Sequence, residues 1–159
     1  MASLEQEIGD LLRRKKLTLG VVESATGGLI SHLITNIAGS SDYYKGSVTA
    51  YSNETKIKLV GVNLATLNKY GAVSAQVAEE MARDGRKVLA VDICLSDTGI
   101  AGPGGATPGK PVGLFYLGLS HKDETSSRKH IFGGDREQNK KAAAEMALTW
   151  LKEYLTGLK

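Results

Sequence analysis

The segment from Glu23 to Gly28, Glu-Ser-Ala-Thr-Gly-Gly, brings two hydroxyl groups and a carboxylate together at one point of the chain. It separates an apolar run, 17–22, from an amphipathic run, 29–37, and the three parts read as strand, turn and helix. At a helix N-terminus the first backbone N–H groups lack partners and the dipole favours negative charge. The Ser24 hydroxyl could therefore act as a nucleophile or bind an anion. Ser and Thr are also frequent helix caps, so a plain helix start explains the same residues.

A second glycine-rich segment runs from Thr98 to Pro111. Its part from Gly104 to Lys110 fits G-x-x-x-x-G-K, the front of a phosphate-binding P-loop, but Pro111 then offers neither a hydroxyl nor an N–H group. A P-loop is therefore excluded. Thr98 follows a predicted strand, at the end where α/β sheets bind ligands, so Ser24 and Thr98 are expected to converge on one crevice. The alternative is a long surface connector.

Lys56 stands at the start of a predicted helix, just after the second predicted strand, which ends near Tyr51. A cation at this end of a helix works against the dipole. Most lysines in such places are simply solvated. An amine near Ser24 in a partly desolvated pocket, however, would have a lowered pKa and could serve as a general base.

Charged residues at two further turns complete the set of candidates. In Gly133-Gly134-Asp135-Arg136 the aspartate fits a helix cap, and Arg136 could clamp a phosphate or a carboxylate. Glu23 could orient its neighbours or be a polar turn residue. The three histidines have no Cys or carboxylate partners at ligand spacing, so no metal is expected.

These residues need a framework of alternating strands and helices. Strands are predicted at 17–22, 47–52, 90–96, 112–120 and 128–132, and helices at 28–38, 54–60, 64–69, 74–86 and 136–156. Ser3 and Gln6 predict a capping box that opens an N-terminal helix. The polar run 122–127 is predicted to connect the last two strands as a hairpin. A βαβ start followed by a hairpin indicates an α/β fold with a mixed sheet covered by helices on both faces.

The composition fits one domain spanning 1–159. The chain has 42% hydrophobic and 23% charged residues and a formal net charge of +3, with two Phe and one Trp, so a nucleic-acid partner is not expected. Cys94 is the single cysteine, which excludes an internal disulfide and a thiolate zinc cluster, and its apolar run predicts a small buried residue. No signal-like or membrane-spanning apolar run appears, so we expect a cytoplasmic protein without a membrane partner.

Six blocks of the sequence, in order, resemble the CinA C-terminal domain family. They are E-S-x-T-G-G at 23–28, G-S-V-x-A-Y-S-N-x-x-K at 46–56, G-A-V-S at 71–74, T-G-I-A-G-P-G-G at 98–105, K-P-V-G at 110–113 and G-D-R at 134–136. Together they cover nearly the whole chain. The resemblance implies a three-layer α/β/α sandwich on a mixed, mostly parallel five-stranded sheet.

The resemblance also implies an activity. Enzymatic members hydrolyse the carboxamide of nicotinamide mononucleotide (NMN), giving nicotinate mononucleotide and ammonia in the pyridine nucleotide cycle. The site this implies uses no metal or cofactor, with Ser24 as nucleophile, Lys56 as base and Tyr51 as a hydrogen-bonding partner in proton transfer. Backbone N–H groups near Ser24 would hold the oxyanion. The residues implied in substrate binding are Glu23, Thr26, Gly27, Gly28, Ser47, Thr98, Gly99, Gly102, Gly105, Arg136 and Lys140.

Three departures from the family pattern bear on these expectations. Ala25 replaces a frequent cysteine, which indicates that a thiol is not needed there. Asn139 and Lys140 replace a frequent Val-Arg pair, and the loss of a guanidinium could weaken phosphate recognition. The activity of the larger N-terminal domain found in some members is not assigned to this chain.

The alternative to the enzyme is a catalytically inactive relative that binds nucleotides or proteins. We expect a homo-oligomer, a dimer, because the amphipathic helix 136–156 can face a partner.

Overall fold

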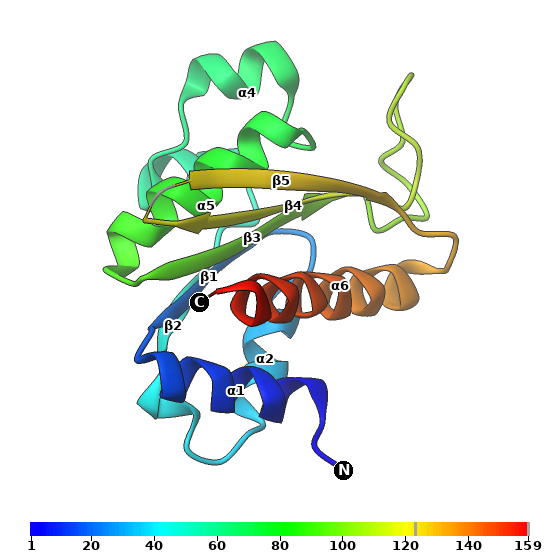
Figure 1. Ribbon diagram of the computed structural model, residues 1–159. Helices are drawn as coiled ribbons and strands as arrows, with labels where there is room; N and C mark the ends of the chain where they lie inside the picture. The colour runs from blue at the N-terminus through cyan, green and yellow to red at the C-terminus, as the bar shows by residue number, and fades with distance from the viewer. Residues whose placement is uncertain (123, 159) are drawn as a thin grey trace.

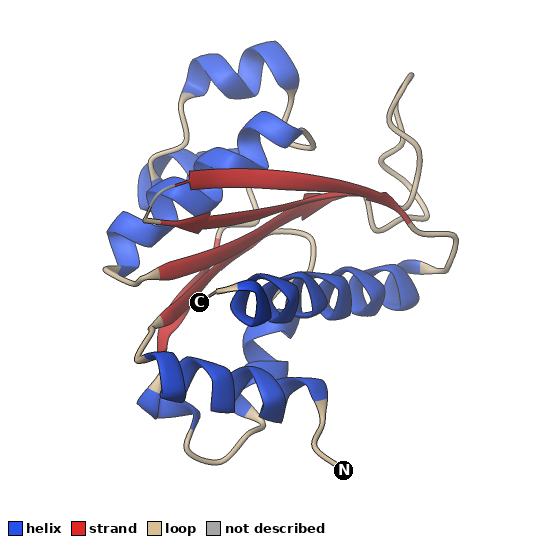
Figure 2. Ribbon diagram, in the orientation of Figure 1, coloured by secondary structure: helices blue, strands red, loops and turns tan. Residues whose placement is uncertain are grey.

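The computed structural model describes residues 1–122 and 124–158, and they form a five-stranded mixed sheet with helices on both faces. The elements in chain order are α1 (Leu4–Lys15), β1 (Leu19–Glu23), α2 (Leu29–Thr35), η1 (Ser40–Asp42), β2 (Tyr44–Thr49), α3 (Asn53–Thr55), η2 (Lys56–Val60), α4 (Leu64–Tyr70), α5 (Ala75–Leu89), β3 (Ile93–Gly99), β4 (Leu114–His121), β5 (Glu124–Ile131) and α6 (Arg136–Gly157). Helices α1, α2 and α6 cover one face, and α4 and α5 lie on the other (Figures 1 and 2). The predicted three-layer α/β fold is confirmed.

The sheet has the strand order β2-β1-β3-β4-β5. Strand β1 pairs in parallel with both β2 and β3, whereas β4 is antiparallel to β3 and β5. The carboxyl ends of β1, β2 and β3 therefore meet at one edge of the sheet, which is where α/β sheets bind ligands. Ser24, the segment after β2 and Thr98 all lie at that edge.

Several predicted boundaries were wrong. The run 124–127 belongs to β5 rather than to a connector, and Asp123 lies outside the described residues. The polar side chains of 124–127 are tolerated because β5 is an edge strand with one open side, where polar residues also discourage pairing with other chains. Strand β2 covers Tyr44–Thr49 instead of 47–52, and β3 continues to Gly99, so Thr98 lies within the strand. The predicted helix 54–60 is a short α-helical turn, α3, followed by a π-helical turn, η2.

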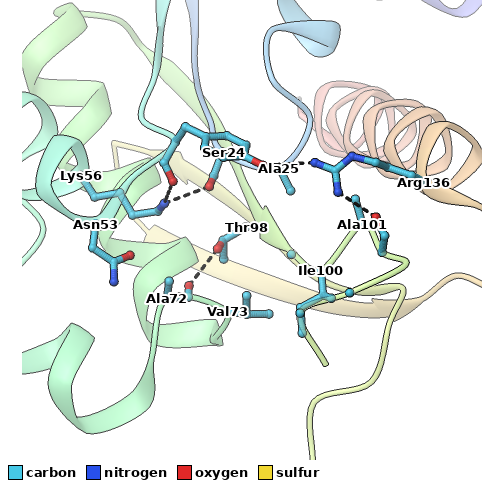
Figure 3. Close-up of a pocket in the computed structure, with 15 residues that line it drawn as sticks. Ser24, Ala25, Asn53, Lys56, Ala72, Val73, Thr98, Ile100, Ala101 and Arg136 are labelled. Atoms are coloured by element: carbon cyan, nitrogen blue, oxygen red, sulfur yellow. Dashed lines mark hydrogen bonds between the residues drawn. The ribbon is translucent and has the colours of Figure 1, made fainter. Parts of the chain in front are cut away.

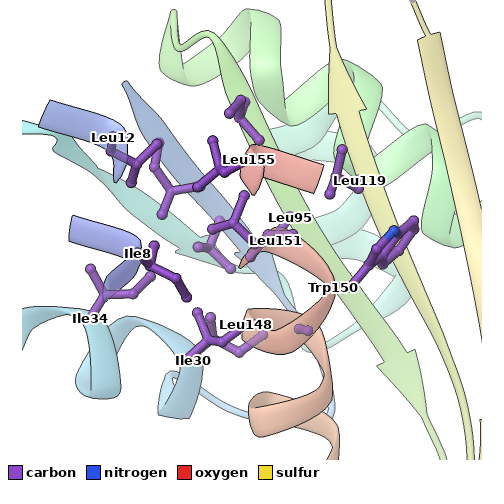
Figure 4. Packing of buried hydrophobic residues seen from close by; sticks show 14 of the residues in the cluster. Ile8, Leu12, Ile30, Ile34, Leu95, Leu119, Leu148, Trp150, Leu151 and Leu155 are labelled. Atoms are coloured by element: carbon purple, nitrogen blue, oxygen red, sulfur yellow. The ribbon is translucent and has the colours of Figure 1, made fainter. Parts of the chain in front are cut away.

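The larger hydrophobic core lies between the sheet and helices α1, α2 and α6 (Figure 4). Ala147, Trp150 and Leu151 of α6 are buried there in one cluster with Leu95 and Leu119 of the sheet. The predicted capping box at the start of α1 is confirmed, with reciprocal hydrogen bonds between Ser3 and Gln6 of 2.8 and 3.2 Å. No helix among the described residues combines the length and the apolar character needed to cross a membrane.

Helix α5 packs very closely against the other face of the sheet. The Ser96 hydroxyl of β3 donates to the Ala78 carbonyl of α5 at 2.6 Å, which closes the gap between helix and strand. Cys94 is buried under the same helix, as predicted. A Cβ added at Gly118 of β4 would lie 2.3 Å from Ser96 Oγ and 2.4 Å from Ala78 O. The absence of a side chain at Gly118 therefore allows α5 to approach the sheet.

We expect Gly118→Ala to lower the free energy of unfolding by about 1–3 kcal/mol, because the added methyl group must push α5 away from the sheet. Urea denaturation followed by circular dichroism would measure the change. Gly133→Ala is the matched control, since a Cβ there meets nothing within 4 Å. Equal stability of the two variants would contradict the close packing of α5.

Candidate active site

Ser24 and Lys56 form a hydrogen-bonded pair at the carboxyl edge of the sheet (Figure 3). Lys56 Nζ lies 2.9 Å from Ser24 Oγ and donates a second bond of 2.9 Å to the Tyr51 carbonyl oxygen. The lysine side chain is only 1% exposed, so its amine is withdrawn from solvent. A buried amine in contact with a serine hydroxyl is the arrangement of a nucleophile with its base.

The local fold explains how the lysine reaches the serine. The Ser52 hydroxyl caps α3 by accepting from the Thr55 N–H group at 3.1 Å. Lys56 then opens the π-helical turn η2, and π-helical turns often occur at functional sites. Val60, at the end of the same turn, is buried against the α5 face of the sheet and anchors it. Lys56 is thereby fixed on a packed element.

Burial lowers the pKa of the Lys56 amine below its ordinary value of 10.5, and the nearby Asp97 carboxylate partly offsets this effect. Desolvation disfavours the charged ammonium form. A larger fraction of Lys56 is therefore neutral near pH 7 than for a solvated lysine. Only the neutral amine can accept a proton from Ser24.

The pair opens into a cavity of about 320 Å³. Eight of the residues named from the sequence line it, namely Ser24, Tyr51, Lys56, Thr98, Gly99, Gly102, Gly105 and Arg136. Asn53, Ala72 and Val73 also line it; they belong to the motif blocks 46–56 and 71–74, but no role was predicted for them. Thr98 holds the wall at Ala72 in place, because its hydroxyl donates to the Ala72 carbonyl oxygen at 2.8 Å.

Arg136 forms the far side of the cavity. Its guanidinium donates to the Gly102 carbonyl oxygen at 2.7 Å and to the Tyr51 hydroxyl at 3.2 Å. The Tyr51 hydroxyl therefore contacts Arg136, whereas the Tyr51 backbone carbonyl contacts Lys56. The structure gives no contact of this hydroxyl with Ser24, so the predicted part of Tyr51 in proton transfer is not supported. Tyr51 is 61% exposed and lies at the mouth of the cavity.

The remaining predicted site residues are not brought to this cavity. Glu23 is fully buried and accepts from the N–H groups of Gly28, Ile30 and Ser31 at 3.1, 2.9 and 3.0 Å. Glu23 therefore caps α2 and satisfies the N–H groups that were expected to face a reacting carbonyl. The predicted substrate contact of Glu23 is wrong for this reason.

Five further predicted site residues lie elsewhere. Thr26 is buried beneath the turn, with its hydroxyl between two carboxylates. Ser47, on β2, lies 3.0 Å from the Ser31 hydroxyl. Gly27, Gly28 and Lys140 line a separate hollow between α2 and α6. None of them lines the cavity of Ser24, so the structure does not place these predicted substrate-binding residues in that cavity.

Asp97 is the residue at the site that the sequence reasoning missed. It is fully buried and accepts from the N–H groups of Ser24 and Thr26 at 3.2 and 3.1 Å. Burial raises the pKa of this carboxyl to about 6, against the opposing effect of its bonds to Thr26 and Ser24. An ionisable residue at the end of an apolar strand, next to Thr98, was the signal that could have identified it.

Asn139 has a structural place that the sequence did not predict. It is fully buried, its amide donates to the carbonyl oxygens of Ala101 and Gly134 at 3.0 Å each, and it accepts from the Gly134 N–H group at 2.9 Å. Asn139 thus ties the start of α6, which carries Arg136, to the glycine-rich loop. Among the described residues, no three His, Cys, Asp or Glu side chains group as a metal site would require.

Comparison with known proteins agrees with this architecture. The family profile of the CinA C-terminal domain matches residues 1–155. A protein of Halothermothrix orenii named as competence-damage inducible is 52% identical over 154 residues, and a CinA-like protein of Salinibacter ruber is 47% identical over 154 residues. These matches cover 96% and 97% of this chain but only 37% of each relative, so the chain spans little more than a third of their length.

Two solved structures match over nearly their whole length. The competence damage-inducible protein A (ComA) of Klebsiella pneumoniae superposes with a TM-score of 0.95 at 28% identity, over 98% of this chain and 97% of that one. The competence/damage inducible protein CihA of Agrobacterium tumefaciens superposes with a TM-score of 0.86 at 33% identity, over 98% and 99% of the two chains.

We expect Asn139→Ala to lower the free energy of unfolding by about 1–3 kcal/mol, because it leaves buried backbone groups of Ala101 and Gly134 without partners. Lys140→Ala, at the adjacent position, should change it by less than about 0.5 kcal/mol. Urea denaturation of both variants tests the difference. If Asn139→Ala is as stable as the wild type, the loop does not depend on this side chain.

Proposed function

The chain belongs to the CinA C-terminal domain family, and from that premise we propose that it is an amidohydrolase with Ser24 as nucleophile and Lys56 as base. The observation that carries the proposal is the 2.9 Å contact between Ser24 Oγ and Lys56 Nζ at the base of an open cavity. Ser–Lys acyl transfer needs no metal ion, because the buried amine performs the proton transfers.

The first half of the reaction is acylation of Ser24. Neutral Lys56 takes the hydroxyl proton while Ser24 Oγ forms a bond to the carboxamide carbon. The carbonyl electron pair moves to oxygen and gives a tetrahedral oxyanion. When this electron pair returns, the C–N bond breaks and the nitrogen takes the proton from Lys56. Ammonia leaves, and the acyl group stays on Ser24 as an ester.

Hydrolysis of the ester completes the cycle. Lys56, neutral again, accepts a proton from a water molecule that attacks the ester carbon. The water oxygen bonds to the ester carbon and gives a second tetrahedral oxyanion. When its electron pair returns, the bond to Ser24 Oγ breaks, and Ser24 recovers its proton from Lys56. The products are a carboxylic acid and free enzyme, so atoms and protons balance over the two steps.

Ala25 supplies a donor for the oxyanion in this scheme. Within residues 24–28 of the described structure, the N–H groups of Ser24, Thr26, Gly27 and Gly28 are used by Asp97, the Ser24 carbonyl and Glu23. The Ala25 N–H group is not taken up by any of these bonds, and Ala25 lines the cavity beside Ser24. The N–H of the residue after a nucleophile is a frequent oxyanion donor, and losing one such donor costs about 3–4 kcal/mol elsewhere.

The substrate we propose is NMN, with nicotinate mononucleotide and ammonia as products in the pyridine nucleotide cycle. Arg136 stands across the cavity from Ser24, where its guanidinium can bind the phosphate while the carboxamide reaches the serine. It is a better candidate for this contact than the start of α2, whose N–H groups are occupied by Glu23. A cytoplasmic location and a homodimer belong to the same proposal.

We expect the purified protein to release ammonia from NMN without added metal, and both Ser24→Ala and Lys56→Met to lower kcat/KM by at least about a thousandfold. The controls are Ser41→Ala and Lys58→Met, since both residues are exposed and Lys58 lies on the same turn as Lys56. A coupled ammonia assay measures the rates. A wild type that is inactive at every pH removes this substrate, and an active Ser24→Ala removes Ser24 as nucleophile.

We expect kcat/KM to rise with pH and to level off above the pKa of Lys56. Below that pKa the amine is protonated and cannot accept the Ser24 proton. Because burial lowers this pKa, the rise should end below pH 10.5, the ordinary value for lysine. A pH series at constant ionic strength tests it. A rate that falls steadily as the pH rises would contradict the assignment of Lys56 as base.

A further inference from the structure

Two buried carboxylates meet beneath the turn that carries Ser24. Ser96 and Thr98 point to the α5 side of the sheet, where they bond Ala78 and Ala72, so Asp97 between them points to the α2 and α6 side. Val22 is packed on the α5 side, so Glu23 likewise points to the opposite side. Both carboxylates are completely buried. Their environment rather than bulk water therefore decides their charge.

One hydroxyl group, that of Thr26, contacts both of these acids. Thr26 Oγ1 lies 2.6 Å from Glu23 Oε1 and in short contact with Asp97 Oδ2. A threonine hydroxyl has one proton and can donate only one of these bonds. The second bond requires a proton on a carboxyl group, which then donates to Thr26 Oγ1. The arrangement thus accommodates a further proton on one of the two acids.

The backbone contacts decide which acid takes that proton. Glu23 accepts three N–H bonds at the start of α2. Asp97 accepts two, from Ser24 and Thr26. Burial raises the pKa of Asp97 to about 6, and the charge of Glu23 adds to that rise. Asp97 therefore carries the additional proton below about pH 6 and is ionised above it.

The charged groups that face Asp97 come from only two neighbouring elements of the described structure. They are Glu23 from β1 and Lys56 from η2, and the charge of Asp97 acts directly on Lys56. On the neighbouring strand β4, the residue paired with Asp97 is the uncharged Leu117. The residues of α6 buried against the sheet, Ala143, Ala144 and Ala147, carry no charge.

We propose that Asp97 is a positioning residue for the Ser24–Lys56 pair: its carboxyl group fixes the turn that carries Ser24, and its charge sets how readily the Lys56 amine takes up a proton. This inference rests on the proposed function. Ionised Asp97 favours the Lys56 ammonium, which forms each time the lysine takes a proton from Ser24 or from water. A neutral side chain at this position leaves Lys56 with a lower pKa and makes it a weaker base.

Asp97→Asn removes the charge at almost unchanged size and is the first variant to test. We expect the titration midpoint of Lys56 to fall by about one pH unit. The matched control is Asp92→Asn. Asp92 is exposed and bonds the Thr18 N–H and hydroxyl groups near the opposite end of the same two strands. The Asp92→Asn substitution should leave the titration midpoint of Lys56 unchanged.

Carbon-13 NMR of the lysine Cε atoms gives the midpoint of Lys56 without any substrate. The Lys56 signal is the one that is absent from the spectrum of Lys56→Met. In parallel, the rising limb of kcat/KM should move to lower pH in Asp97→Asn, and its plateau should fall. A purely structural role would lower the rate at every pH and leave both midpoints in place. That result would overturn the proposal.

The wild type and Thr26→Val decide the question if Asp97→Asn does not fold. In the wild type the hydroxyl bond from Thr26 lowers the pKa of Asp97. Thr26→Val removes this bond but keeps both backbone bonds to Asp97, so the substitution should raise that pKa. In the wild type the amide signals of Ser24 and Thr26 and the Cε signal of Lys56 should share an inflection near pH 6. In Thr26→Val that inflection should move to higher pH. The absence of this inflection from the Lys56 signal in both proteins overturns the proposal.

These measurements separate the inference from the function on which it rests. If the wild type releases no ammonia from NMN, the proposed function fails, while the NMR midpoints still show whether Asp97 controls the charge of Lys56. If the wild type is active but Lys56 titrates identically in the folded variants, the amidohydrolase stands and Asp97 has no part in tuning its base.

Discussion

Burial of the Lys56 amine is the constraint on which the site depends. A lysine withdrawn from water is stable only with hydrogen-bond acceptors, and here the Ser24 hydroxyl and the Tyr51 carbonyl fill that need. Both acceptors come from chain segments that leave parallel strands at the same edge of the sheet. The desolvation that makes the amine costly to bury also lowers its pKa, and that is the property a general base requires.

The walls of the cavity are held by backbone contacts. Thr98 fixes the segment before α5 through Ala72, and Asn139 fixes the glycine-rich loop through Ala101. Arg136 bonds the same loop at Gly102, so the first turn of α6 and the loop form one unit. The close packing of α5, which Gly118 permits, keeps β3 and its Thr98 in register with this wall. Rigid support of this kind is what pre-organised catalysis needs.

The turn at Ser24 has two acids beneath it with different tasks. Glu23 closes the N-terminus of α2 by accepting its free N–H groups, so the helix start is satisfied internally. Asp97 holds the backbone of Ser24 and Thr26 from the neighbouring strand. Because the first turn of α2 is occupied in this way, the N–H group of Ala25 is left as the donor nearest to Ser24. In the function that we propose, anion recognition therefore falls to Arg136 instead of the helix dipole.

The sequence by itself determined the α/β framework and the set of segments that meet at the carboxyl edge of the sheet. Hydrophobic periodicity fixes elements locally, and the six motif blocks placed Ser24, Lys56, Thr98 and Arg136 at or near the ends of these elements. Only the tertiary structure decided what each side chain does within that framework. Glu23 caps a helix, Asn139 anchors a loop and Asp97 holds the turn of Ser24, and these roles depend on burial and on partners up to 73 residues apart in the chain. The local sequence pattern does not encode such pairings, because they are set by the strand order β2-β1-β3, which brings distant residues together.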